Sequence, residues 1–199
     1  MLNSINSQEW IKNQWPSKMF FDPRLHKRVI KIAQAFLNFP NRSIPKRFTS
    51  AGDVKACYNI LKRPEMDHQT LQIPHYENVL EEALKSSGKV LLIQDGSELL
   101  YNSHKWTSGL GPTGDAYGHG IMFHSCLAVK IEEEHSHVIG LACQKAWVRE
   151  EAQEKKDTEE SEGEVWRKMI EWIGAVPLGH VWITVGDRAS DIFLCRDVV

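Results

Sequence analysis

Two aspartates stand where their carboxylates could bind a divalent metal ion. Asp95 follows the apolar run at residues 90–93, and Asp187 follows a second apolar run at residues 180–185. Side chains that follow neighbouring parallel strands meet at the same edge of an α/β sheet. Carboxylate oxygens suit Mg²⁺ or Mn²⁺, and two such ions can activate water for attack at phosphorus. Asp95 and Asp187 are therefore predicted as catalytic metal ligands; the alternative is that each caps a turn.

Basic residues gather in the first third of the chain. Residues 1–63 hold twelve Lys and Arg against three acids, a net charge of +9, whereas the remainder carries −11. This asymmetry predicts a head that binds double-stranded DNA. The alternative is a chance grouping of cations on a solvated face. The predicted DNA-binding residues are Arg24, Lys27, Arg28, Lys31, Arg42, Lys46, Arg47, Lys62 and Arg63.

Cysteine and histidine give weaker candidates. The cysteines form no C-x-x-C pair and no zinc-ligand spacing, so free buried thiols in a reducing compartment are expected. They are Cys57, Cys126, Cys143 and Cys195. His119 and His124 lie in a segment unlike the H-E-x-x-H helix of metalloproteases, and we interpret them as loop and strand residues.

Helical spacing in the basic segment would position its cations. Residues 7–15 predict a helix capped by Ser7, and Asp22 with Pro23 predicts the start of a second helix that ends near Pro40. Residues 41–49 are expected to form a loop. A third helix is predicted over residues 53–62 and a fourth over residues 75–86. The inward residues predicted for the third helix are Val54, Cys57, Tyr58 and Leu61. Together these elements predict a helical DNA-binding domain over residues 1–85.

A mixed sheet is predicted beyond residue 86. Strands are expected at residues 90–93, 98–101, 121–131, 138–147 and 180–185, with a short helix at residues 165–173. The glycine-rich residues 107–120 predict a mobile loop, and the acidic residues 150–164 predict a solvated stretch. Strands, a helix and a further strand give an α/β fold class for residues 86–199.

Motifs in both halves resemble one family. The head has Trp10 in its first helix, D-P-R at residues 22–24, A-C-Y at residues 56–58 and K-R-P at residues 62–64. The second half has L-L-I-Q-D at residues 91–95, H-S at residues 124–125 and G-D-R-A-S-D-I at residues 186–192, the most specific of these motifs. The chain resembles bacterial insertion-sequence DDE transposases of the transposon-five-like group.

The resemblance implies a helical head that binds transposon ends and a ribonuclease-H-like core for metal-dependent DNA cleavage and strand transfer, with Mg²⁺, or Mn²⁺ in its place. Asp95 and Asp187 match the family's first two carboxylates. The family's third carboxylate, a Glu well downstream, has no counterpart here, because the chain stops twelve residues after Asp187. We therefore expect a truncated transposase with an incomplete core, one that lacks the surfaces by which family members dimerise on DNA.

Two alternatives to a transposase fragment stay open, and with them the question of enzyme activity. One is a catalytically inactive protein that blocks transposon ends; the other is a small ribonuclease-H-like nuclease. No run of 18 apolar residues occurs, and the N-terminus lacks the apolar core of a secretory signal. A cytoplasmic, nucleoid-associated bacterial protein with no membrane partner is expected.

Overall fold

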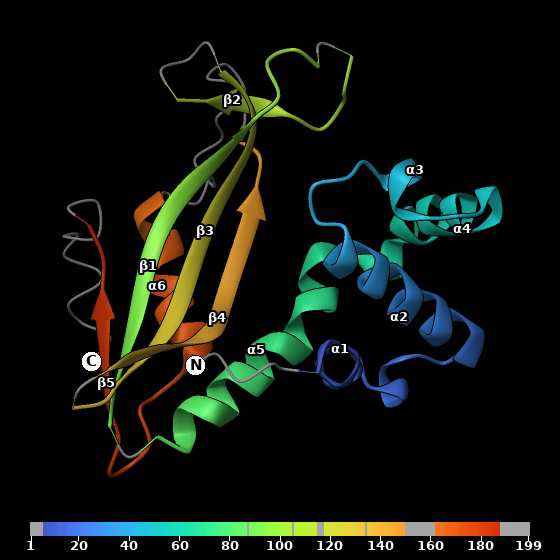
Figure 1. Cartoon of the computed structure of the whole chain (residues 1–199). Helices are drawn as coiled ribbons and strands as arrows, with labels where there is room; N and C mark the ends of the chain where they lie inside the picture. The colour runs from blue at the N-terminus through green and yellow to red at the C-terminus, as the bar shows by residue number, and fades with distance from the viewer. Residues whose placement is uncertain are drawn as a thin grey trace. The chain divides into compact units, whose positions relative to one another are not determined.

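The computed structural model describes residues 6–86, 88–104, 106–114, 118–133, 135–149 and 162–187. The chain divides into two compact units, Met1–Pro74 and His75–Val199, drawn in Figure 1. The first unit is helical and the second is a mixed sheet with helices, so the predicted α/β class is confirmed. The predicted domain division after residue 85 stays a prediction.

The first unit, hereafter the head, contains four whole α-helices and the first part of a fifth among its described residues. The whole helices are α1 (Ser7–Gln14), α2 (Pro23–Asn38), α3 (Ile44–Arg47) and α4 (Ala51–Leu61), with 3₁₀ turns η1 (Ser17–Met19) and η2 (Pro64–Met66). Asp22 caps α2 as predicted, because its Oδ1 accepts the Arg24 backbone N–H at 2.8 Å. The cap of α1 was predicted wrongly: Asn6, not Ser7, accepts the backbone N–H of Gln8.

Three further predictions for the helices require correction. The expected loop at residues 41–49 contains α3, where Pro45 in the first turn has the backbone angle that a helix needs. In α4 the buried residues are Cys57 and Ile60. Tyr58 and Leu61, predicted to face inward, are 42% and 50% exposed. The helix predicted from residue 75 is α5 (His68–Leu84), which begins earlier because Asp67 accepts the backbone N–H of Thr70.

The head encloses a small apolar core. Val29, Ile60 and Met66 are buried together, and partly buried neighbours pack around them. These neighbours are Trp15, Phe20, Leu25, Ile32 and Leu71. The Trp15 indole also donates to the Leu71 carbonyl at 2.9 Å. The core therefore joins the second half of α4 to α2, and Ile11 of α1 and Cys57 of α4 are also buried in the head.

The second unit, hereafter the core unit, is built on one sheet. Its strands are β1 (Lys89–Leu100), β2 (Gly111–Thr113), β3 (Gly118–Ile131), β4 (Ser136–Trp147) and β5 (Val181–Val185). β3 pairs antiparallel with β1, β2 and β4, whereas β5 pairs parallel with β1. The strands predicted near residues 121–131, 138–147 and 180–185 are confirmed.

Two strand predictions were wrong because strands run through segments that were predicted as a turn or a loop. β1 was expected to end at residues 94–96 and a second strand to follow, but one strand runs from Lys89 to Leu100 and pairs with β3 throughout. The glycine-rich loop contains β2, and β3 begins inside it at Gly118. Pairing with β3 therefore outweighs the local preference of glycine for turns.

Helices cover one face of this sheet. Val90 and Leu92 of β1 pack with Val79 and Ala83 of α5 and with Met169 of α6 (Glu162–Ile173). Figure 1 shows α6 against the sheet. Most of the predicted solvated stretch, residues 150–161, lies outside the described residues. Its last three residues, 162–164, belong to α6.

The thiols behave as predicted where they are described. Cys57 in the head, and Cys126 with Cys143 in the core unit, are free and buried. Cys126 and Cys143 face each other across β3 and β4. Cys195 lies outside the described residues. None of the described helices is both long and apolar enough to span a membrane.

Candidate nucleic-acid interface and carboxylate site

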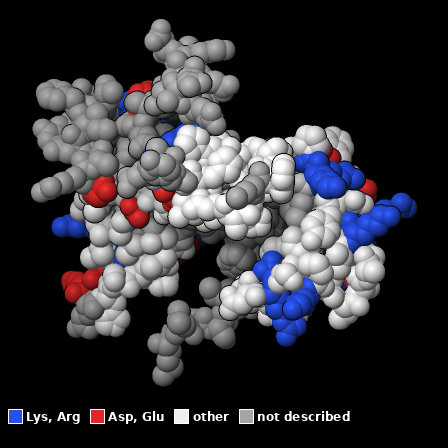
Figure 2. Space-filling model, turned by 90° about the horizontal axis from the view of Figure 1, so that it is seen from above, with Lys and Arg blue, Asp and Glu red and all other residues white. Residues whose placement is uncertain are grey.

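One face of α2 carries four exposed cations. Arg24, Lys27, Arg28 and Lys31 recur at helical spacing and all are exposed, whereas Val29 on the other side of the helix is buried. Asp22 fixes where the helix begins and so sets the direction in which these side chains point. Figure 2 shows Lys and Arg side chains grouped on the head. Such a row of cations can neutralise backbone phosphates of DNA.

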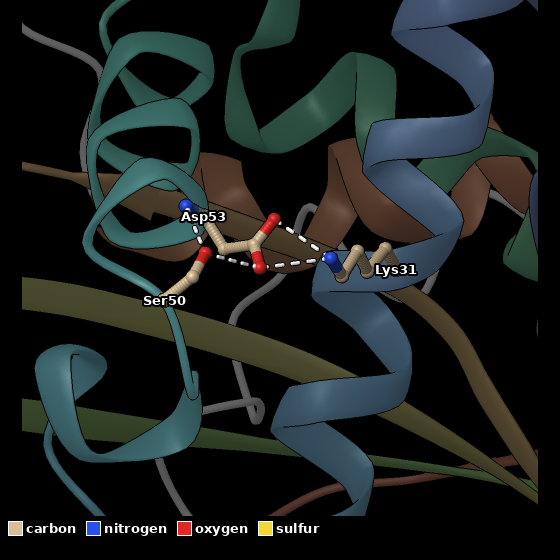
Figure 3. Close-up of polar contacts among 3 residues, drawn as sticks. All are labelled: Lys31, Ser50 and Asp53. Atoms are coloured by element: carbon tan, nitrogen blue, oxygen red, sulfur yellow. Dashed lines mark hydrogen bonds and ion pairs between the residues drawn. The ribbon is translucent and has the colours of Figure 1, made fainter.

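Lys31 differs from its neighbours because an acid holds it. Its Nζ lies 2.7 Å and 2.8 Å from the two carboxylate oxygens of Asp53, at the start of α4 (Figure 3). Ser50 Oγ donates to Asp53 Oδ2 at 2.7 Å and accepts the Asp53 backbone N–H at 3.1 Å. The hydrogen bond from Lys31, followed by that from Ser50, lowers the pKa of Asp53 below its ordinary value of 3.8.

The predicted cations between α2 and α4 divide into structural and exposed groups. Arg47 is half-buried: its guanidinium lies over the Phe36 ring and donates to the carbonyls of Phe39 and Pro40 at 3.0 Å and 2.6 Å. Arg42 lies over the Phe39 ring at 4.3 Å and stays exposed. Lys46 is exposed as well. Arg47 therefore ties the α3 segment to the end of α2, and Lys46 is more accessible to a phosphate.

The end of α4 carries the last two predicted cations. Lys62 and Arg63 are exposed, and Arg63 Nη1 lies 3.0 Å from Glu65 Oε1. Lys55 and Asn59, which were not predicted as binding residues, are also exposed on α4. Both side chains can form hydrogen bonds with base edges. If Cys57 and Ile60 are assigned to the interior of the helix, helical periodicity predicts that Lys55 and Asn59 face outward.

A shallow hollow of about 430 Å³ lies in the head beside these cations. Lys12 of α1, Lys31 of α2 and Arg47 of α3 contribute to its lining, and so does Asp53. Apolar side chains, among them Ile30 and Phe48, contribute as well. Asp53, the ion-pair partner of Lys31, is the one acid in this lining, so the net charge of the lining residues is positive.

The two predicted metal ligands stand level on neighbouring strands. β1 and β5 are parallel, with Ile93 opposite Val185, and Asp95 and Asp187 each follow two residues later. This confirms the expected adjacency of their strands; the distance between the carboxylates stays a prediction. Both residues are exposed. Side chains alternate between the two faces of the sheet along β1. Gln94 is buried on one face, so Asp95 points to the other face.

A buried imidazole on β3 is within the electrostatic influence of both carboxylates. His124 of β3 is 2% exposed, its Nε2 lies 2.9 Å from Gln94 Oε1, and its ring meets Trp166 of α6 edge-on at 4.2 Å. Burial lowers the pKa of His124 below 6.5, while the negative charges of Asp95 and Asp187 act in the opposite direction. The strand predicted for His124 is confirmed, whereas His119, which was predicted in a loop, also lies in β3.

The carboxylate site has few acidic ligands among the residues that the structure describes. In that part of the chain, no three His, Cys, Asp or Glu side chains gather where they could hold a metal ion. Two exposed carboxylates at adjacent strands provide the hard oxygen donors that Mg²⁺ prefers, but this ion also keeps several waters and favours additional charge. The oxygen donors of Asp95 and Asp187 are of the kind that Mg²⁺ or Mn²⁺ prefers, and their role as metal ligands stays a prediction.

Comparison with known proteins assigns the head. Residues 7–66 match a family model described as transposase DNA-binding. The match begins at the first residue of α1 and ends at the last residue of η2. It supports a transposase N-terminal domain here, with a transposase-like role in DNA binding and DNA as the partner. No curated protein matches the chain.

Proposed function

We propose that this chain binds duplex DNA at transposon ends and takes part in DNA transposition. The observation that carries the proposal is the agreement between the transposase DNA-binding match at residues 7–66 and the cationic face of α2 within it. Arg24, Lys27 and Arg28 supply phosphate contacts, and the exposed Arg42, Lys46 and Lys62 extend them; Arg63 contributes less because Glu65 pairs with it. In bacteria such a protein would act in the cytoplasm, on the nucleoid.

Phosphate contacts make the binding sensitive to salt. Each neutralised phosphate releases condensed counterions, so the logarithm of the association constant falls with the logarithm of salt concentration by about 0.9 per contact. Contacts of this kind position a protein on DNA without reading sequence. Lys55 and Asn59 on the outward side of α4 are the polar side chains suited to base edges.

Metal-dependent DNA cleavage by the core unit is the second proposed activity. It is favoured by the register of β1 and β5, which brings Asp95 and Asp187 level, and by the electrostatic effect of both on His124. Adjacent parallel strands for these two residues are what a ribonuclease-H-like core requires. Asp95 and Asp187 would hold Mg²⁺ or Mn²⁺, which when bound lowers the pKa of water and neutralises charge at phosphorus.

One experiment tests both activities. The chain is incubated with a labelled transposon-end duplex in Mg²⁺ or Mn²⁺, and binding and strand nicking are measured on the same samples. Nicking that Asp95→Ala and Asp187→Ala each abolish, while binding is kept, supports a cleavage enzyme. Binding without nicking favours a protein that occupies transposon ends. A chain that does not bind duplex DNA contradicts the whole proposal.

A further inference from the structure

We infer that Lys31 is the interhelical partner of Asp53 and does not serve as a phosphate contact. This inference rests on the proposed DNA-binding function of the head and separates one cation from the row to which its sequence position assigns it. On spacing alone, Lys31 continues the series of Arg24, Lys27 and Arg28. The contacts of its ammonium group set it apart.

The Asp53 carboxylate is aimed at Lys31 by the cap of its own helix. Ser50 accepts a hydrogen bond from the Asp53 backbone N–H and donates its hydroxyl to Asp53 Oδ2, so both the backbone and the side chain of Asp53 are held. The two carboxylate oxygens then meet the Lys31 ammonium at 2.7 Å and 2.8 Å (Figure 3). Asp53 also lies in the first turn of α4, where the helix dipole favours a negative charge.

Local charge explains why this contact removes Lys31 from the DNA surface. The ion pair is electrically neutral, so it displaces no counterion from DNA as it stands. To reach a phosphate, the ammonium would have to leave both carboxylate oxygens and expose Asp53 to a polyanion. Lys27 lies one turn away, is exposed, and has no ion pair among the described residues, so it pays no such penalty.

The decisive comparison is the salt dependence of binding for the double variant Lys31→Gln/Asp53→Asn and for Lys27→Gln. The full chain and a labelled random-sequence duplex are titrated at several salt concentrations. Lys27→Gln should make the slope shallower by about 0.9, whereas the double variant, which removes the neutral pair as a whole, should leave it unchanged. Asp53→Asn alone, which keeps the side-chain shape, should free Lys31 and steepen the slope by up to about 0.9. Equal loss of slope in the double variant and in Lys27→Gln overturns the inference.

A readout without DNA tests the pair separately. The pKa of Asp53, followed by carboxyl ¹³C NMR in the full chain, should rise in Lys31→Gln and stay constant in Lys27→Gln. A pKa unaffected by Lys31→Gln overturns the ion pair even if the wild-type chain binds no DNA. Loss of wild-type binding at every salt concentration, with the Asp53 pKa responding as expected, contradicts the proposed function and leaves the ion pair standing.

Discussion

The head and the core unit place their functional groups in opposite ways. The cations of the head lie on exposed helix faces, around a core in which Val29, Ile60 and Met66 are the buried members. Of the core unit's carboxylates, Asp95 lies on β1 and Asp187 follows the parallel strand β5, in a sheet that α5 and α6 cover on one face. Binding in the head therefore depends on local helix geometry, and the core site depends on long-range strand register.

The largest loss of stability is expected from a substitution in the core unit. Trp166→Ala should destabilise the core unit by about 3–5 kcal/mol, because a buried indole that packs on His124 leaves a cavity. Amide hydrogen exchange reads the two units separately, and protection should fall in the core unit. Trp106→Ala is the matched control, since Trp106 is 99% exposed. Equal losses from the two substitutions would argue against the packing of α6.

A smaller loss is expected from the corresponding change in the head. Ile60→Ala should cost about 2–4 kcal/mol, because Ile60 is 6% exposed and packs with Val29 and Met66. Leu61→Ala, one residue further on and 50% exposed, should change stability by less than about 0.5 kcal/mol. Thermal unfolding monitored through the head amides measures both. A larger loss of stability from Leu61→Ala than from Ile60→Ala would instead support the inward-facing Leu61 that was predicted from the sequence.

A small pH dependence of stability is expected in the core unit from His75. His75 Nε2 accepts the Leu141 backbone N–H at 3.2 Å, and burial lowers the pKa of His75 below 6.5. The unfolded chain therefore binds a proton first, so stability falls as pH drops below about 6.5 and levels off below the folded-state pKa. The melting temperature should decrease by a few degrees on acidification, with less decrease in His75→Gln. An identical pH profile in that variant would remove His75 as a cause.

What the sequence could predict follows the same division between local helix geometry and long-range strand pairing. Asp22 and Pro23 predicted the start of α2 because capping is local, and the cationic face followed from helical spacing. The single strand β1 was missed, since only pairing with β3 carries it through Gly96. Sequence placed Asp95 and Asp187 after apolar runs, and the register of β1 with β5 brought them level. The contact between Lys31 and Asp53 joins two helices and has no signal in spacing.

We propose that the head binds duplex DNA through phosphate contacts from α2. The most direct measurement is the salt dependence of DNA binding by the wild-type chain and by Arg24→Ala/Arg28→Ala, with stability checked by thermal unfolding. The wild-type slope should be steep, and it should become shallower by about one for each arginine removed. An unchanged slope in a folded double variant would contradict it and remove these arginines from the DNA surface.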